Sequence, residues 1–286
     1  MSSKIKVDTI ENIAGSGNVS LGSGHNLVVP GNITGQGTTT LTGDLTVDTS
    51  TLKVDSSNNR VGVGNPSPLA VLDVKGNTDT YGGMAKVYLT DSNSSSGSRN
   101  WSIGNGGNAY GTLTISKSKV KDGNPAASGT HDETLLINNL GHVTTPLQPS
   151  FSVRSTGGNN GNTWEAGQEI KFQVVDTNIG SHYATGTGRF TAPVAGKYQF
   201  NYVGFGYTAG RVPAGGTATV QLRINGTARI TGAYVEVNSS TGYPNCGFSF
   251  SVRLAVNDYV TIRAATNGQY ADSSGLYTAF SGYLVG

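Results

Sequence analysis

The chain has 286 residues, 42 of them glycine, and only 13% are charged, where about a quarter is typical of globular proteins. The low net charge of +2 argues against a disordered polyelectrolyte and gives no basic surface that would predict binding to nucleic acid. The single cysteine, Cys246, excludes an intrachain disulfide and a cysteine-based metal site. Short alternating runs rich in Gly, Thr and Val, without a long run of helical period, predict an all-β protein.

The sequence contains no evident membrane anchor or secretion signal. No apolar run approaches the roughly 20 residues that a transmembrane helix needs. The N-terminal residues 1–13 lack the apolar centre of a signal peptide. We therefore expect the chain to be made and assembled in a cytoplasm, without insertion into a membrane.

Residues 1–64 carry short apolar groups between turns that contain Gly or Asp. The first group, from Ile5 to Ile10, begins with alternating apolar and polar residues and predicts one short strand. A domain of about 60 residues is marginal even with a good core, and these groups offer little core material. We therefore predict an intertwined trimeric β shaft whose core is shared between chains. A disordered, Gly-rich linker is the alternative.

Residues 65–148 predict a small middle β domain that follows a junction at 61–76, where Pro66 and Pro68 stop a strand. The loops between its strands are long and polar, as surface loops are. Pro146 and Pro149 mark the boundary with the next domain. We expect its strands at 85–89, 100–103, 112–115 and 134–137.

Residues 149–286 have longer and more aromatic strands. Tyr198, Phe200 and Tyr202 alternate with polar residues, which predicts a strand with one buried face. Eight or more strands in this segment suit a jelly-roll β-sandwich. We expect them near 151–155, 170–175, 187–192, 197–205, 217–225, 228–237, 246–256, 258–266 and 276–285.

This C-terminal segment resembles the complement globular-head family, the C1q-like domains, which share the trimeric jelly roll of the tumour-necrosis-factor superfamily. The resemblance implies a homotrimeric binding head, in which Tyr198, Phe200 and Tyr202 are candidates for the trimer core. The same three side chains could equally form the core of one subunit. The residues that match, spacing included, are Phe172, Asn178, Tyr183, Phe190, Gly196, Tyr198, Phe200 and Tyr202, with the flanking pieces 149–152, 222–226 and 280–284.

Residues 6–35 and 60–76 resemble shaft segments of tailed-phage fibre proteins, particularly those of phages that infect cyanobacteria. Residues 87–107 are similar to a small domain found beside such shafts. The resemblance implies a structural virion protein, a homotrimeric tail fibre that docks to other virion structural proteins through its N-terminal region. The alternative is a capsid fibre or decoration protein, or a passive tail spacer. The docking candidates are Ile5, Val7 and Ile10.

No constellation of residues predicts catalysis or a cofactor. The nearest carboxylate pairs are Asp132 with Glu133 and Glu165 with Glu169, and solvation of loops explains both. The histidines are isolated from one another and from Cys246, without metal-ligand spacing. We therefore expect no cofactor, no metal and no enzyme activity; a depolymerase acting on glycan is the least favoured alternative.

The loops of the predicted jelly roll carry aromatic and polar side chains on a rigid scaffold. Aromatic faces stack on sugar rings, while Asn, Asp and Arg hydrogen-bond to hydroxyls, so the expected partner is a host cell-surface glycan or protein. Alternatively, the tyrosines only stabilise the loops or the trimer. The candidates for receptor contact are Tyr207, Arg211, Tyr243, Asn245, Tyr270 and Asp272.

Overall fold

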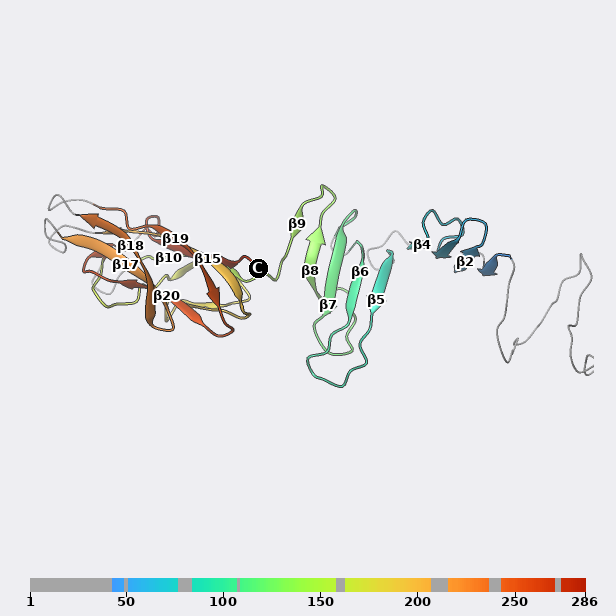
Figure 1. Cartoon of the computed structure of the whole chain (residues 1–286), viewed down its shortest axis with the longest axis horizontal. Helices are drawn as coiled ribbons and strands as arrows, with labels where there is room; N and C mark the ends of the chain where they lie inside the picture. Colours follow the sequence, from blue (N-terminus) through green and yellow to red (C-terminus); the bar gives the residue numbers. More distant parts are fainter. Residues whose placement is uncertain are drawn as a thin grey trace, which may run out of the picture. The chain divides into compact units, whose positions relative to one another are not determined.

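The computed structural model of the protein describes residues 43–48, 51–76, 84–106, 109–157, 163–206, 216–236, 243–270 and 274–286 (Figure 1). Every regular element in these residues is a β-strand, which confirms the predicted all-β class. The chain divides into two compact units, Met1–Asp73 and Val74–Gly286. The docking candidates Ile5, Val7 and Ile10 lie outside the described residues. The described part has no helix that is long and apolar enough to cross a membrane.

The first described sheet contains four short strands in chain order: β1 (Leu45–Val47), β2 (Leu52–Asp55), β3 (Arg60–Val63) and β4 (Leu72–Val74). Its register places apolar side chains opposite one another on a single face, since residues directly across a strand pair share a face. These side chains are exposed or half-buried. The predicted trimeric shaft would cover such a face, and it remains a prediction. The paired positions are Leu45 with Val54, Val47 with Leu52, and Val54 with Val61.

The next sheet is a five-stranded antiparallel meander: β5 (Lys86–Leu89), β6 (Trp101–Asn105), β7 (Leu113–Ser118), β8 (His131–Ile137) and β9 (Val143–Thr144) (Figure 1). The four strands predicted in this region are confirmed, each overlapping one of β5 to β8. Sequence reasoning missed β9, which has two residues and too short a pattern to recognise.

The covered face of this meander is polar. Ser102 Oγ donates a hydrogen bond to the Pro125 carbonyl at 3.1 Å, and Asn100 Nδ2 donates to the Gly123 carbonyl at 2.9 Å, so the loop at 119–130 lies over this face. Among the described residues from 84 to 144, Pro125 of the covering loop is the one buried apolar side chain. The buried polar side chains are Asn100, Ser102, Thr112, Thr114, Ser116 and Ser118.

The C-terminal head is a sandwich of two five-stranded antiparallel sheets, which confirms the predicted jelly roll. One sheet has the order β12 (Val174–Ile179), β10 (Ser150–Arg154), β22 (Ala279–Leu284), β15 (Gly196–Val203) and β19 (Phe248–Leu254). The other has the order β13 (Tyr183–Ala184), β14 (Arg189–Thr191), β20 (Tyr259–Ala264), β17 (Thr217–Ile224) and β18 (Thr227–Glu236).

Aromatic rings from both sheets form the core between them. Phe151 of β10 stacks on Phe190 of β14 at 4.9 Å between ring centroids, and it meets Phe280 of β22 edge-on, also at 4.9 Å. All three rings are buried. Burial of such large rings is the main contribution that holds the two sheets together.

Most predicted strands of the head agree with the structure within a few residues, and one is displaced. The strand expected at 170–175 runs instead from Val174 to Ile179. Ile170 and Phe172 are fully buried, but they lie in an irregular segment before the strand. The alternation of apolar residues therefore predicted their burial correctly but placed the strand wrongly. An irregular segment can also insert alternate side chains into a core.

A candidate binding site lined by aromatic side chains

A third, short sheet lies within the head, in the order β11 (Thr163–Trp164), β21 (Gln269–Tyr270) and β16 (Phe205–Gly206). Tyr270 pairs with Thr163 on one side and with Phe205 on the other, so these three side chains share a face. The opposite face carries the buried Trp164 and Gln269.

The segment at 243–246 extends this sheet beyond β16. Asn245 forms a β-bridge with Phe205, and the Gly206 amide donates to the Pro244 carbonyl at 2.8 Å. A Cβ at Gly206 would lie 3.1 Å from Pro244 Cγ and 2.5 Å from the Ala218 Cβ, so a glycine is needed for both neighbours to pack this closely. Tyr243, two residues before Asn245, is thereby directed to the side of the sheet that carries Phe205 and Tyr270.

Four aromatic side chains line a hollow of about 360 Å³ on this side: Phe205, Tyr243, Tyr270 and Tyr277. We call it the aromatic hollow. The rings form two edge-to-face pairs, Phe205 with Tyr277 at 6.0 Å and Tyr243 with Tyr270 at 5.0 Å. Tyr243 is 56% exposed and Tyr277 is 52% exposed, so both present ring surface to solvent. The described lining carries no charged side chain.

A hydrogen bond and buried side chains lie beneath the aromatic hollow. Thr278 Oγ1 donates to the Tyr270 carbonyl at 2.9 Å and fixes the backbone next to Tyr277. Cys246 is buried, and burial raises the pKa of its thiol to about 11, which keeps the sulfur protonated and unreactive at neutral pH. Trp164 Nε1 and Gln269 Oε1 are buried and find no hydrogen-bond partner within the described part of the chain.

The structure brings together two of the six predicted receptor-contact residues, Tyr243 and Tyr270. Asn245 is exposed nearby, where its Oδ1 accepts a hydrogen bond from the Gly247 amide at 2.8 Å; it does not line the aromatic hollow. Tyr207, Arg211 and Asp272 lie outside the described residues. In the ranges that the structure describes, no three His, Cys, Asp or Glu side chains gather in a way that could hold a metal ion.

Sequence reasoning missed Phe205 and Tyr277, and a usable signal existed for both. The residues of β15 that face the core have even numbers, Tyr202 among them, so the odd-numbered Phe205 is expected on the outward face. Likewise, Phe280 of β22 faces the core, so the odd-numbered Tyr277 is expected to face outward. An aromatic residue at an outward position was therefore a usable signal for both, but Tyr283 of β22 shares this feature without lining the aromatic hollow.

The three trimer-core candidates lie inside one subunit. Tyr198 and Phe200 are fully buried and Tyr202 nearly so, packed against other rings of the same chain. These three side chains therefore form part of the core of one subunit, one of the two roles that the sequence left open. A role at the trimer interface stays a prediction, and it would have to be indirect because the side chains are buried within their own chain. Burial also raises the pKa of the Tyr202 hydroxyl.

The outward face of the same strand is polar. Gln199 Nε2 donates to Ser249 Oγ at 2.7 Å, and Ser249 Oγ donates to Asn201 Oδ1 at 2.9 Å. Ser251 Oγ donates to Gln199 Oε1. These bonds link β15 to the edge strand β19 and leave a polar, partly exposed surface along that edge of the sheet.

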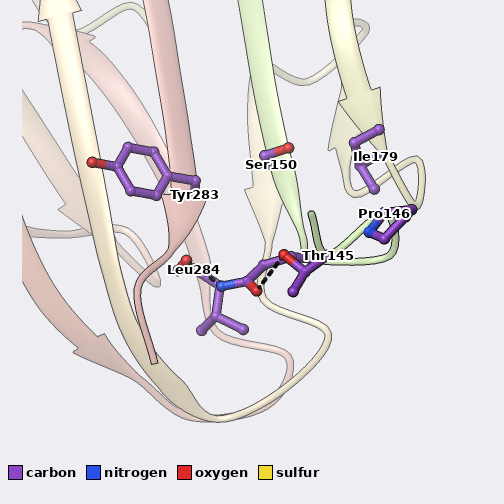
Figure 2. Close-up of a pocket in the computed structure, with 7 residues that line it drawn as sticks. Thr145, Pro146, Ser150, Ile179, Tyr283 and Leu284 are labelled. Atoms are coloured by element: carbon purple, nitrogen blue, oxygen red, sulfur yellow. Dashed lines mark hydrogen bonds between the residues drawn. The ribbon is translucent and has the colours of Figure 1, made fainter. Parts of the chain in front are cut away.

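A second hollow, of about 380 Å³, lies where the chain enters the head (Figure 2). Gln148 Nε2 donates to the Leu284 carbonyl at 2.7 Å, and the Leu284 amide donates to the Pro149 carbonyl at 3.0 Å. Figure 2 shows Pro146 of the entering segment near Ile179 and Thr145 near Leu284, with Ser150 and Tyr283 on the neighbouring strands. These contacts attach the linker to the last strand of the head, which gives this hollow a structural role.

Residues 150–285, a little under half of the chain, match the family model described as C1q domain. The head is similar to the globular domain of the zebrafish complement 1qA protein, with 19% identity, 49% of this chain and 98% of that chain covered, and a TM-score of 0.38. It is also similar to murine APRIL at pH 5.0 (11% identity, 48% and 99% covered, TM-score 0.39). A further similar structure is Eiger TNF from S. frugiperda (9% identity, 49% and 94% covered, TM-score 0.39).

Proposed function

We propose, from the premise that residues 150–285 form a C1q-like jelly roll, that this protein is a homotrimeric fibre of a tailed phage. The head binds the host surface without catalysis, and the N-terminal region docks to other structural proteins of the virion. The chain has three parts in this proposal: the docking and shaft region at 1–64, the middle domain at 65–148 and the head at 149–286. The aromatic hollow is the observation that carries the binding role.

The aromatic hollow suits a neutral ligand with apolar ring faces, such as a sugar of a surface glycan. Exposed faces of Tyr243 and Tyr277 can stack on a pyranose ring, while the tyrosine hydroxyls and nearby Asn245 can hydrogen-bond to its hydroxyl groups. The lack of charge among the described lining residues favours a neutral sugar over an acidic one.

The trimeric state is supported by the family, since C1q-like domains are commonly homotrimeric. The polar outward face of β15 and β19 offers hydrogen-bonding side chains along one edge of a sheet, which suits a wet contact between identical heads. Three copies of a weak site on one particle would raise the apparent affinity by a factor of about 100 or more if the receptors can be reached together.

Binding of purified chain to host envelope glycan, measured on a glycan array and then by calorimetry, tests the role of the aromatic hollow. We expect Tyr243→Ala and Tyr277→Ala each to weaken binding at least fivefold, since loss of one aromatic contact costs about 1 kcal/mol. Tyr88→Ala is the matched control, because Tyr88 is an exposed tyrosine of the middle sheet. Unchanged binding by both hollow variants would remove the basis for this site.

Two further measurements test the rest of the proposal. Native mass spectrometry of the full chain should give three chain masses, and a monomer would contradict the fibre. Imaging of virions with an antibody to the head should label the tail. Label on the capsid would instead favour the head-fibre alternative.

A further inference from the structure

The middle sheet has an apolar face that nothing in the described chain covers. Six side chains from four of its strands make up this apolar face and are all exposed: Val87, Leu89, Trp101, Ile103, Leu113 and Val143. Val87 lies directly opposite Ile103, and Leu89 lies opposite Trp101, so these positions share one side of the sheet. The sheet runs unbroken from β5 to β9 (Figure 1).

This arrangement is the reverse of an ordinary half-buried sheet. The side that the 119–130 loop covers carries Ser102, Thr114 and Ser116, and the side without cover carries the large hydrophobic residues. Sheets gain stability by burying one apolar face against another layer. Apart from Pro125 of the loop, no apolar side chain is buried among the described residues 84–144, so the middle sheet lacks a hydrophobic core unless a partner supplies the other layer.

We propose that the apolar face packs against the same face of other copies of this chain, so that the middle domains of the trimer share one core. The inference rests on the homotrimer of the proposed function and extends it to a surface outside the head.

The charge of the surface favours an identical partner. At the end of the apolar face the Lys117 ammonium lies 2.7 Å from the Asp132 carboxylate and the Lys119 ammonium lies 3.9 Å from it, which leaves one excess positive charge in this group. The Lys117 hydrogen bond holds the pKa of Asp132 below its ordinary value, so this carboxylate stays ionised at neutral pH. The six apolar positions carry no charge, and the excess positive charge lies at one end of the face, so identical faces can approach over most of their area without repulsion.

The area of the apolar face also suits an interface between copies of the chain. The five strands together have 24 residues, which at about 3.4 Å per residue and about 4.8 Å between strands give roughly 400 Å² of sheet. A stable interface takes about 800 Å² from each partner, so the apolar face supplies about half of that area and contacts made by the heads add to it.

The linker keeps the copies close to one another. β9 ends at Thr144 and β10 begins at Ser150, and the five residues between them span at most about 18 Å. Three heads joined in a trimer would thus confine three apolar faces to a small volume, equivalent to a millimolar local concentration.

Quenching of tryptophan fluorescence by acrylamide in the full chain tests this inference. The chain has two tryptophans: Trp164 is 1% exposed in the head, and Trp101 is 37% exposed on the apolar face of a single chain. If copies cover the face, both tryptophans are protected, and Trp101→Phe lowers the emission without changing the quenching constant. If the face is open, the quenching constant of the wild type is several-fold larger than that of Trp101→Phe, which keeps only the buried Trp164.

A matched pair of charge variants gives the second measurement. Ile103→Asp places a carboxylate on the apolar face and should expose Trp101 to quencher, whereas Tyr88→Asp places it on the opposite side at similar exposure and should not. The wild-type quenching result stands even if Ile103→Asp fails to fold.

Native mass measured on the same samples separates the outcomes. A trimer with protected Trp101 supports the inference. A trimer in which Trp101 is quenched as strongly as in the unfolded chain overturns it and leaves the proposed homotrimer intact. A monomer overturns both proposals, and a monomer with protected Trp101 assigns the cover to residues of the same chain.

Discussion

Gly282→Ala should destabilise the head, because Gly282 makes room for two rings of the aromatic core. Gly282 lies on β22 between its two neighbours, directly opposite Phe151 on β10 and Phe200 on β15. A Cβ added at Gly282 would lie 2.5 Å from Phe200 Cδ1 and 2.8 Å from Phe151 Cε1. Carbon atoms pack at about 3.5–4.0 Å, so each contact is about 1 Å too short.

The rings cannot move aside freely, since Phe151 also packs against Phe190 and Phe280, at centroid distances of 4.9 Å in both cases. Overpacking of this kind costs about 1–3 kcal/mol, and we expect a value near the upper end because both rings are confined. For a domain of this size the melting temperature should fall by roughly 5–12 °C.

Thermal and urea unfolding of Gly282→Ala, followed by near-ultraviolet circular dichroism, measures this cost. Ser281→Ala is the control, because Ser281 lies on the other face of the same strand. If Gly282→Ala unfolds within about 0.5 kcal/mol of the wild type, the packing argument for this position is wrong.

Three other outcomes follow from the head. Tyr202→Phe should leave stability unchanged or raise it by up to about 1 kcal/mol in urea unfolding, since the buried Tyr202 hydroxyl has no hydrogen-bond partner within the described residues; a clear loss would reveal a partner. Cys246 should resist thiol labelling at pH 8 until the head unfolds; rapid labelling of native protein would contradict its burial. Because burial raises the pKa of Cys246 from 9.0 to about 11, its contribution to stability is complete below pH 9 and is lost as pH rises toward 11. Between pH 8 and 10 the free energy of unfolding should fall by about 1 kcal/mol more in wild type than in Cys246→Ala; equal slopes would refute this.

Strand content and the inward faces of the head were predictable from sequence. Val220, Leu222 and Ile224 alternate with polar residues, and all three are buried as the period of two requires. Period-two alternation depends only on local backbone geometry, so it can be recognised without knowing which strands pair. The aromatic positions that resemble the C1q-like pattern lie in the part of the chain that the family model matches.

Part of the candidate site was also within reach. Tyr243 and Tyr270 were predicted as contact residues because the sequence places them on loops. In the structure their ring centroids are 5.0 Å apart. Their convergence with Phe205 and Tyr277 was not predictable, since the four residues come from separate segments joined by the pairing of β16 with β21 and by the bridge at Asn245. Such long-range pairing leaves no local pattern in the sequence.

The sequence by itself therefore determined that the chain is built of strands and which side chains of each strand share a face. Only the tertiary structure decided which of those faces are covered. In the head, alternation and burial coincide because a second sheet lies over the apolar side. In the middle sheet, the same alternation directs Trp101 and Ile103 toward solvent and the serines under a loop. A period of two separates two faces but cannot say which one meets another layer, because that depends on segments distant in the chain and on neighbouring copies.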